Sequence, residues 1–178
     1  MDFYQISVKE IKNGVPQLYP DWTVGRSKDL MVRGRSFYAV WDEEKNLWST
    51  DEYDVQRLVD QDLHKYNAEH NNEYKVQSLR SYNTQVWSKF RSFMQNISDN
   101  SHALDENIIF ANTDVKKSDY ASKRLSYSLE PGTHNSWDEL ISVLYSEEEK
   151  TKIEWAIGAI VSGDSKFIQK FLVFYGPA

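Results

Sequence analysis

The chain has 178 residues, of which 40% are hydrophobic and 14% aromatic, and these fractions predict a globular protein with a packed core. The net charge of −6 argues against a protein that coats nucleic acid over its whole surface. Cysteine is absent, which excludes disulfides and thiolate metal sites, and the sequence suggests neither a signal peptide nor a bilayer-spanning run, so we expect a cytoplasmic protein with no membrane partner.

Short strands and turns are predicted for the first fifty residues. Residues 37–41, FYAVW, are apolar throughout, residues 42–46 are polar, and Leu47 and Trp48 are apolar again. This order is typical of a β-hairpin.

Two helices are predicted next. Ser49 and Glu52 have the spacing of a capping box, and apolar residues then recur at steps of three and four. These residues are Val55, Leu58, Val59, Leu63 and Tyr66. A second helix is predicted to begin at Thr84, with an apolar stripe that we interpret as core rather than as a base-stacking surface. The stripe comprises Val86, Trp87, Phe90, Phe93, Met94 and Ile97.

A domain boundary is predicted in the polar stretch 98–107, which has no apolar periodicity. We therefore expect a small mixed α/β domain at residues 1–100 and a helical region at residues 101–178. The expected fold class is α+β and mainly helical.

Beyond the boundary, residues 108–112 and 171–175 are predicted as strands, and residues 136–145 and 147–162 as helices. Capping-box spacing marks both helix starts, at Ser136 with Glu139 and at Ser146 with Glu149. We expect the two helices to pack through five apolar side chains. They are Leu140, Leu144, Ile153, Ile157 and Ile160.

The last part of the chain, residues 104–178, resembles a known family. The matching stretches are IIFANTDVKKSDYASKRLSYSLEPG, WDELISVLY and EEEKTKIEWAIGAIVSGDSKFIQKFLVFYGPA. In this order they resemble the region just before the nucleotide-binding loop of the superfamily 3 helicases of phages and viruses, a family that includes the poxvirus primase-helicase. That loop has the pattern G-x-x-x-x-G-K-[ST]. The resemblance implies that Gly176 is its first glycine, with Pro177 and Ala178 as spacer residues.

The resemblance further implies a phage replicative DNA helicase, acting in a bacterial host as a hexamer with ATP and Mg²⁺ as cofactors. This chain would hold the lead-in and first strand of an AAA+-type ATPase domain. It contains neither the lysine nor the hydroxyl residue of the loop, which contact the phosphates and the metal. We therefore expect an N-terminal fragment that has no catalytic residues and no cofactor of its own.

Basic residues gather near a glycine-containing turn, beside aromatic residues. They are Arg26, Lys28, Arg33 and Arg35, followed by Phe37, Tyr38 and Trp41. A second segment, residues 75–91, has basic side chains and no acidic one, and includes Lys89 and Arg91. Cations with aromatic rings are typical of single-strand binders, although a solvated turn also explains the first group. We expect weak binding of single-stranded DNA.

Other site types have less support. Asp60 and Asp62 form a D-x-D pattern, but on a helix residues two apart diverge by about 200°, so a solvated acidic face is expected. The four histidines do not pair at metal-ligand spacing, and no metal is assigned. Two alternative functions stay open. One is a non-enzymatic loader or adaptor whose acidic helix, residues 50–66, meets a basic partner; the other is a primase catalytic domain, which needs carboxylates gathered in space.

Overall fold

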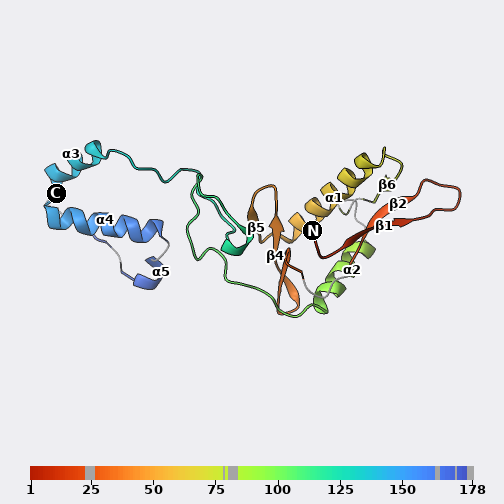
Figure 1. The fold of residues 1–178 in the computed structure, drawn as a ribbon. Helices are drawn as coiled ribbons and strands as arrows, with labels where there is room; N and C mark the ends of the chain where they lie inside the picture. Colours follow the sequence, from red (N-terminus) through yellow and green to blue (C-terminus); the bar gives the residue numbers. More distant parts are fainter. Residues whose placement is uncertain (23–26, 78, 80–83, 163–164, 171, 176–178) are drawn as a thin grey trace. The chain divides into compact units, whose positions relative to one another are not determined.

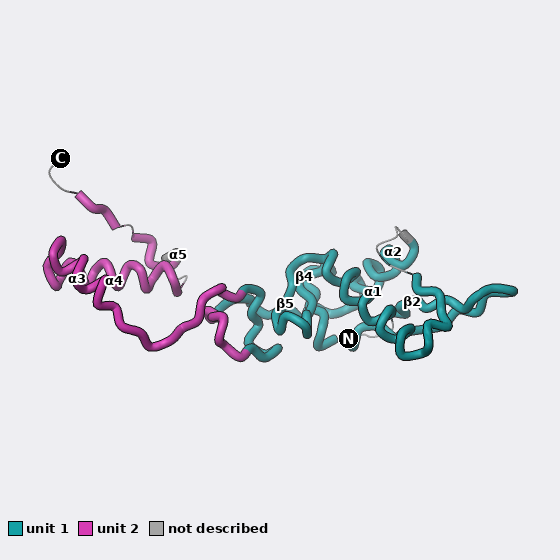
Figure 2. The backbone as a smooth tube through the Cα atoms, turned by 90° about the horizontal axis from the view of Figure 1, so that it is seen from above, with its two compact units in different colours: residues 1–106, 115–123 teal, residues 107–114, 124–178 magenta. Residues whose placement is uncertain are grey.

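The computed structural model describes residues 1–22, 27–77, 79, 84–162, 165–170 and 172–175. Within them the chain is α+β, with helices and two three-stranded sheets (Figure 1). It divides into two compact units, coloured separately in Figure 2. Unit 1 comprises residues 1–106 and 115–123, and unit 2 comprises residues 107–114 and 124–178. The prediction placed the boundary after residue 100, whereas in this division residues 101–106 and 115–123 belong to unit 1.

The first sheet of unit 1 contains β1 (Gln5–Lys9), β2 (Gln17–Asp21) and β6 (Lys75–Val76). β2 lies in the middle, antiparallel to β1 and parallel to β6. Leu18 on β2 is fully buried, which places this sheet against the main core of the unit.

The second sheet contains β3 (Leu30–Arg33), β4 (Ser36–Asp42) and β5 (Leu47–Ser49), all antiparallel, with β4 in the middle. The β4–β5 pair confirms the predicted hairpin, with Trp41 opposite Trp48. β3 is an edge strand of this sheet, which matters for the site described below.

Two helices complete unit 1: α1 (Glu52–Glu69) and α2 (Thr84–Gln95), both close to the predicted ranges. The predicted cap of α1 is wrong. Asp51 is the N-cap, and its carboxylate accepts a hydrogen bond from the backbone of Tyr53 at 2.9 Å. The Ser49 hydroxyl instead donates to Asp54 at 2.6 Å, so it ties β5 to the first turn of the helix.

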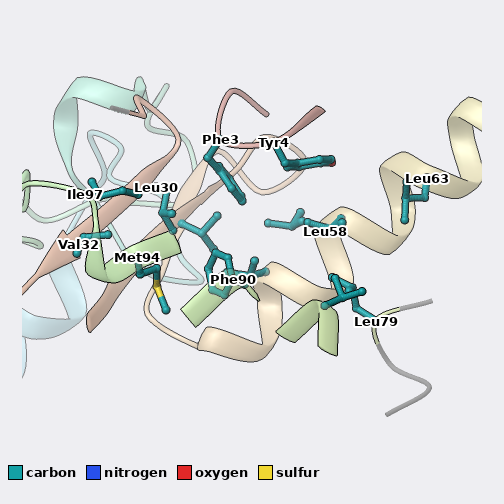
Figure 3. Close-up of a cluster of buried hydrophobic side chains, with 14 of the residues drawn as sticks. Phe3, Tyr4, Leu30, Val32, Leu58, Leu63, Leu79, Phe90, Met94 and Ile97 are labelled. Carbon is teal, nitrogen blue, oxygen red and sulfur yellow. The ribbon is translucent and has the colours of Figure 1, made fainter. Parts of the chain in front are cut away.

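The second sheet separates two hydrophobic clusters, because successive residues of a strand point to opposite faces. Leu30, Val32 and Val40 face the larger cluster, which α1 and α2 also enter. Figure 3 shows side chains of this cluster, among them Phe3, Leu58, Leu63, Phe90 and Met94. The full burial of Phe90 confirms the core interpretation of the α2 stripe at that position.

The opposite side of the same sheet carries a smaller cluster, here called the aromatic face, formed by Met31, Ala39, Trp41 and Trp48. Leu104 and Tyr120 pack against it from the segments that follow α2. The backbone N–H of Trp48 donates to the carbonyl of Ala121 at 2.8 Å. The 3₁₀ helix η1 (Lys117–Asp119) precedes this contact. The polar residues up to 106 therefore belong to unit 1 and help to cover its second sheet.

Unit 2 contains α3 (Asn135–Leu144), α4 (Glu147–Val161) and α5 (Ser165–Ile168). The first two confirm the predicted helices. The predicted capping box of α4 is also confirmed: the Ser146 hydroxyl accepts from the backbone of Glu149 at 3.4 Å, and the Glu149 carboxylate accepts from the backbone of Ser146 at 2.8 Å.

The equivalent box predicted for α3 is wrong, because this helix begins one residue before Ser136. Its N-cap is His134, which makes no side-chain capping hydrogen bond. The His134 imidazole lies 3.0 Å from the carboxylate of Asp138 instead.

The two strands predicted for unit 2 are wrong as far as the structure describes them. Residues 108–112 make only two main-chain hydrogen bonds to residues 125–127, from Leu125 to Ile109 and from Ala111 to Tyr127, which is too short a ladder for a strand. Residue 171 lies outside the described residues, and residues 172–175 pair with no described strand. An apolar run forms a strand only where a partner supplies hydrogen bonds.

The predicted packing between α3 and α4 is largely wrong. Ile153 is buried, but the other four predicted side chains are exposed, with Leu140 at 59% and Ile160 at 69%. Two helices can cover only one stripe of each other, so most of their apolar surface stays open within this unit.

Candidate nucleic-acid interface

The predicted basic residues of the N-terminal group lie along strand β3. Lys28 lies just before the strand, Arg33 is its last residue, and Arg35 lies in the turn to β4. All three are exposed, and within the described residues none of them forms an ion pair. Arg26 lies outside the described residues.

The β3–β4 turn is held in a defined conformation. Gly34 and Arg35 both have positive φ, 59° and 60°, as required in the two-residue turns that match the twist of a hairpin. The carboxylate of Asp99 accepts hydrogen bonds from the backbone of Gly34 at 2.9 Å and from that of Arg35 at 3.5 Å. The left-handed conformation of Arg35 costs about 1 kcal/mol, and this carboxylate helps to offset it.

The free edge of β3 is closed by Asn100. Its side-chain oxygen accepts from the backbone of Val32 at 2.7 Å, and its side-chain nitrogen donates to the carbonyls of Leu30 at 2.9 Å and Ser27 at 3.2 Å. The backbone N–H of Asn100 also donates to the carbonyl of Val32 at 3.1 Å. An edge strand otherwise leaves these groups unpaired. Asp99 and Asn100 together fix the strand that carries the basic residues.

Arg33 lies on the aromatic side of the sheet. Its guanidinium carbon is 5.7 Å from the centroid of the Tyr38 ring, within cation–π range, and Tyr38 packs against the aromatic face. The stacking orients the guanidinium without neutralising it, so its charge remains available to an anion.

A cavity of about 380 Å³, here called the β3 cavity, opens between Lys28 and the aromatic face. Its wall carries a ladder of three rings. The His102 ring stacks on Tyr120 with centroids 4.2 Å apart, and Tyr120 stacks on Trp48 at 6.2 Å. The cavity is lined by Ser27, Lys28, Met31, Trp48, Asn100, His102, Lys117, Ser118 and Tyr120.

Lys117 of η1 contributes a second, internally paired cation to this cavity. Its ammonium forms an ion pair with the buried carboxylate of Asp29 and lies 5.6 Å from the centroid of the Trp41 ring. The carbonyl of Lys117 accepts from the indole N–H of Trp48 at 2.9 Å. Lys117 thus holds the wall of the cavity, while Lys28, which has no ion-pair partner in the part of the chain that the structure describes, adds an exposed positive charge to its lining.

The second predicted group, on α2, has different partners. Lys89 is exposed, and the guanidinium of Arg91 lies 3.5 Å from the carboxylate of Glu52 and 5.9 Å from the Trp87 ring. These contacts direct Arg91 toward the start of α1. Among the described residues, no hydrogen bond, ion pair or ring contact joins Lys89 or Arg91 to Lys28, Arg33 or Arg35.

The D-x-D carboxylates diverge, as predicted, but the expectation of a solvated pair is wrong for Asp60. Asp60 is only 5% exposed and accepts a hydrogen bond from the backbone of Leu79 at 2.6 Å. Asp62 accepts from the hydroxyl of Tyr4 at 2.6 Å. Burial, together with the Asp62 carboxylate, raises the pKa of the Tyr4 hydroxyl, which therefore stays protonated and keeps donating.

The described residues form neither the predicted nucleotide-binding loop nor a group that could bind a metal ion. Among the described residues, no group of three or more His, Asp or Glu side chains is arranged to hold a metal ion. Gly176, Pro177 and Ala178, the predicted start of a phosphate-binding loop, lie outside the described residues.

The residues that sequence reasoning missed are those of the ring ladder. Trp48, His102 and Tyr120 come from three separate segments, and no local spacing relates them. No sequence signal marks these residues. The structure does mark Tyr120, whose φ of 48° is uncommon for a residue with a bulky side chain and often indicates a special site.

Comparisons of the chain with protein-family models, with curated proteins and with solved structures give no significant match. In the part of the chain that the structure describes, no helix has the length and apolar character needed to cross a membrane. A functional proposal therefore depends on the sequence pattern and on the geometry of unit 1.

Proposed function

We propose that this chain is the N-terminal part of a phage replicative DNA helicase of superfamily 3, a group that includes primase-helicases. In this proposal unit 1 contacts single-stranded DNA, and unit 2 is the helical lead-in to an AAA+-type ATPase domain. ATP and Mg²⁺ belong to the rest of the parent protein, which hydrolyses the nucleotide. The sequence resemblance over residues 104–178 supports the assignment to this family.

The DNA-binding part of the proposal is carried by one observation. Lys28 lines a cavity walled by aromatic rings, and Arg33 stacks on Tyr38, which packs against the aromatic face; both cations are exposed and without ion-pair partners among the described residues. Single-strand binders combine cations that follow the backbone with ring faces on which bases stack. The acidic net charge limits binding elsewhere on the surface.

The proposed assembly into a ring is supported by the exposed apolar side chains of unit 2. Val143 is 82% exposed, Leu144 61% and Ile160 69%, and apolar surface of this kind is typical of regions that pack against another part of a protein. In a hexamer this surface would pack against the ATPase domain or a neighbouring subunit.

Two observations count against the alternatives. A primase catalytic domain needs converging carboxylates, whereas Asp60 and Asp62 bond to Leu79 and Tyr4, two separate partners. An adaptor that binds through an acidic helix needs free carboxylates on α1, whereas Asp54 is already paired with Arg57 and Asp60 is buried.

Fluorescence anisotropy with a labelled oligothymidine tests the proposal at low salt. We expect micromolar affinity for the wild-type chain and a clear loss for Arg33→Ala/Arg35→Ala. The matched control is Lys9→Ala/Lys12→Ala, which removes the same charge from exposed positions in and just beyond β1. Undetectable wild-type binding would contradict DNA contact and favour the adaptor function, whereas equal losses in both double variants would contradict a specific role of Arg33 and Arg35.

A further inference from the structure

We propose that the β3 cavity receives one nucleotide unit of a single DNA strand, with its base stacked on His102 and its phosphate bound by Lys28. This inference rests on the proposed function, since it assumes that unit 1 contacts single-stranded DNA. It adds a recognition pocket for a base to what would otherwise be a purely electrostatic contact.

The size of the cavity fits this ligand. Its volume of about 380 Å³ lies at the small end of the range for pockets that bind small organic molecules. It is therefore large enough for one base with part of its sugar, and too small for a base pair with its two backbones.

The ring ladder offers a stacking surface at the mouth of the cavity. Trp48 is buried, Tyr120 is half-buried and His102 is exposed, so the imidazole is the outermost ring. Its inner face is covered by Tyr120, with ring planes 21° apart. The outer face of His102 can accept a base, which extends the ladder by one ring.

The charges around the cavity favour a phosphate beside the stacked base. The backbone of Lys28 is fixed by Asp2, whose carboxylate accepts from its N–H at 2.7 Å and also from the hydroxyl of Ser27. The buried Asp29 carboxylate is paired with Lys117 and accepts from the backbone N–H of Asp2 at 2.9 Å. These acids are therefore engaged with internal partners, whereas the Lys28 ammonium is exposed.

The same geometry selects single strands over duplexes. In a duplex each base is stacked and paired, so its ring face cannot reach a pocket without being flipped out. An unpaired strand presents its bases directly, and a thymine or a purine can stack with little sequence preference.

The experiment compares His102→Ala and Lys28→Ala with wild type for binding to oligothymidine and to a strand of abasic sugar-phosphate units. The controls are His64→Ala and Lys12→Ala, which are exposed elsewhere in unit 1. We expect His102→Ala to weaken oligothymidine binding about tenfold without changing its salt dependence. His102→Phe should restore the affinity for oligothymidine, because phenylalanine keeps a ring for stacking. For the abasic strand, wild type and His102→Ala should have equal affinities, because this strand has no base to stack.

Lys28→Ala should lower the salt slope by about 0.7, the value for one phosphate of a single strand. Wild-type binding to oligothymidine with an unchanged affinity in His102→Ala would overturn the pocket while leaving the proposed function intact. No wild-type binding at all would overturn both.

A measurement on the wild-type chain covers the case in which a variant fails to fold. The His102 imidazole resonances, assigned from the spectrum of His102→Phe or by triple-resonance methods, should shift on titration with oligothymidine. Shifts at other residues with none at His102 would overturn the pocket.

Discussion

Asn100 and Val32, 68 residues apart, are joined by two hydrogen bonds, one from the Val32 backbone to the Asn100 side chain and one from the Asn100 backbone to the Val32 carbonyl. The pair acts as a one-residue extension of the sheet beyond β3. Through this pair the polar stretch around residue 100, which resembles a linker in sequence, lies along the edge of the sheet next to the strand that carries Arg33.

Asn100→Ala should lower the free energy of unfolding by about 1–3 kcal/mol, because it leaves the backbone N–H of Val32 and the carbonyl of Leu30 without their side-chain partner. Urea denaturation measures this loss. Asn96→Ala is the control, since the one side-chain hydrogen bond of Asn96 among the described residues is an exposed bond to Ser92, so its loss should cost at most about 0.5 kcal/mol. Equal costs would show that the edge contact is unimportant.

Arg57→Met should also be destabilising, by less than the roughly 3–5 kcal/mol that full removal of a buried partner costs. The Asp42 side chain is only 1% exposed, and its carboxylate accepts from Arg57 at 2.5 Å, so the variant removes the nearest cation and leaves the carboxylate with Lys45 at 3.3 Å. In Asp42→Asn/Arg57→Met the loss should be smaller than the sum of the two single losses, as denaturation of all three variants will show. Simple additivity would mean that the two residues do not act as a pair.

The same pair predicts a pH dependence. Burial alone would raise the pKa of Asp42, but hydrogen bonds from Arg57 and Lys45 outweigh it and hold the pKa below its usual 3.8. The folded chain then binds fewer protons than the unfolded chain, so this stabilisation is complete above pH 3.8 and is lost as the pH falls through the folded pKa. Denaturation midpoints between neutral and acidic pH should fall more steeply for wild type than for Asp42→Asn. Parallel profiles would exclude Asp42 as a source of acid sensitivity.

Ser146→Ala should destabilise α4 by about 1 kcal/mol, since it removes one half of the capping box. Circular dichroism in urea provides the measurement. Ser136→Ala is the matched control, because the structure gives Ser136 no role as the cap of α3, and its loss should be small. A larger loss at Ser136 would favour the helix start that the sequence predicted.

Helices were predictable from sequence where periodicity was strong, and α1 to α4 all lie within a few residues of their predicted ranges. The first residue of each helix was harder to predict. Capping-box spacing favours Ser49 as the N-cap of α1, but Asp51 can also cap this helix, and it does so because it directly precedes Glu52, the first helical residue. The strand predicted at 108–112 fails for another reason, because strand formation depends on a partner that local sequence does not reveal.

The candidate site was only partly predictable. Arg33 and Arg35 stand out because a glycine between two cations signals an exposed turn. The β3 cavity could not be predicted, since His102 and Tyr120, whose rings stack in its wall, come from separate segments that no local sequence pattern relates. Asp60 was expected in solvent because its burial depends on Leu79, which lies in another segment.

The salt dependence of single-strand binding tests the central claim most directly. The logarithm of the affinity of wild type and of Arg33→Ala/Arg35→Ala for oligothymidine is measured against the logarithm of the salt concentration. If both arginines contact phosphates, the slope should become shallower by about one to one and a half units in the double variant, because each phosphate of a single strand contributes about 0.7. An unchanged slope would contradict the proposal that the β3–β4 turn of unit 1 contacts DNA.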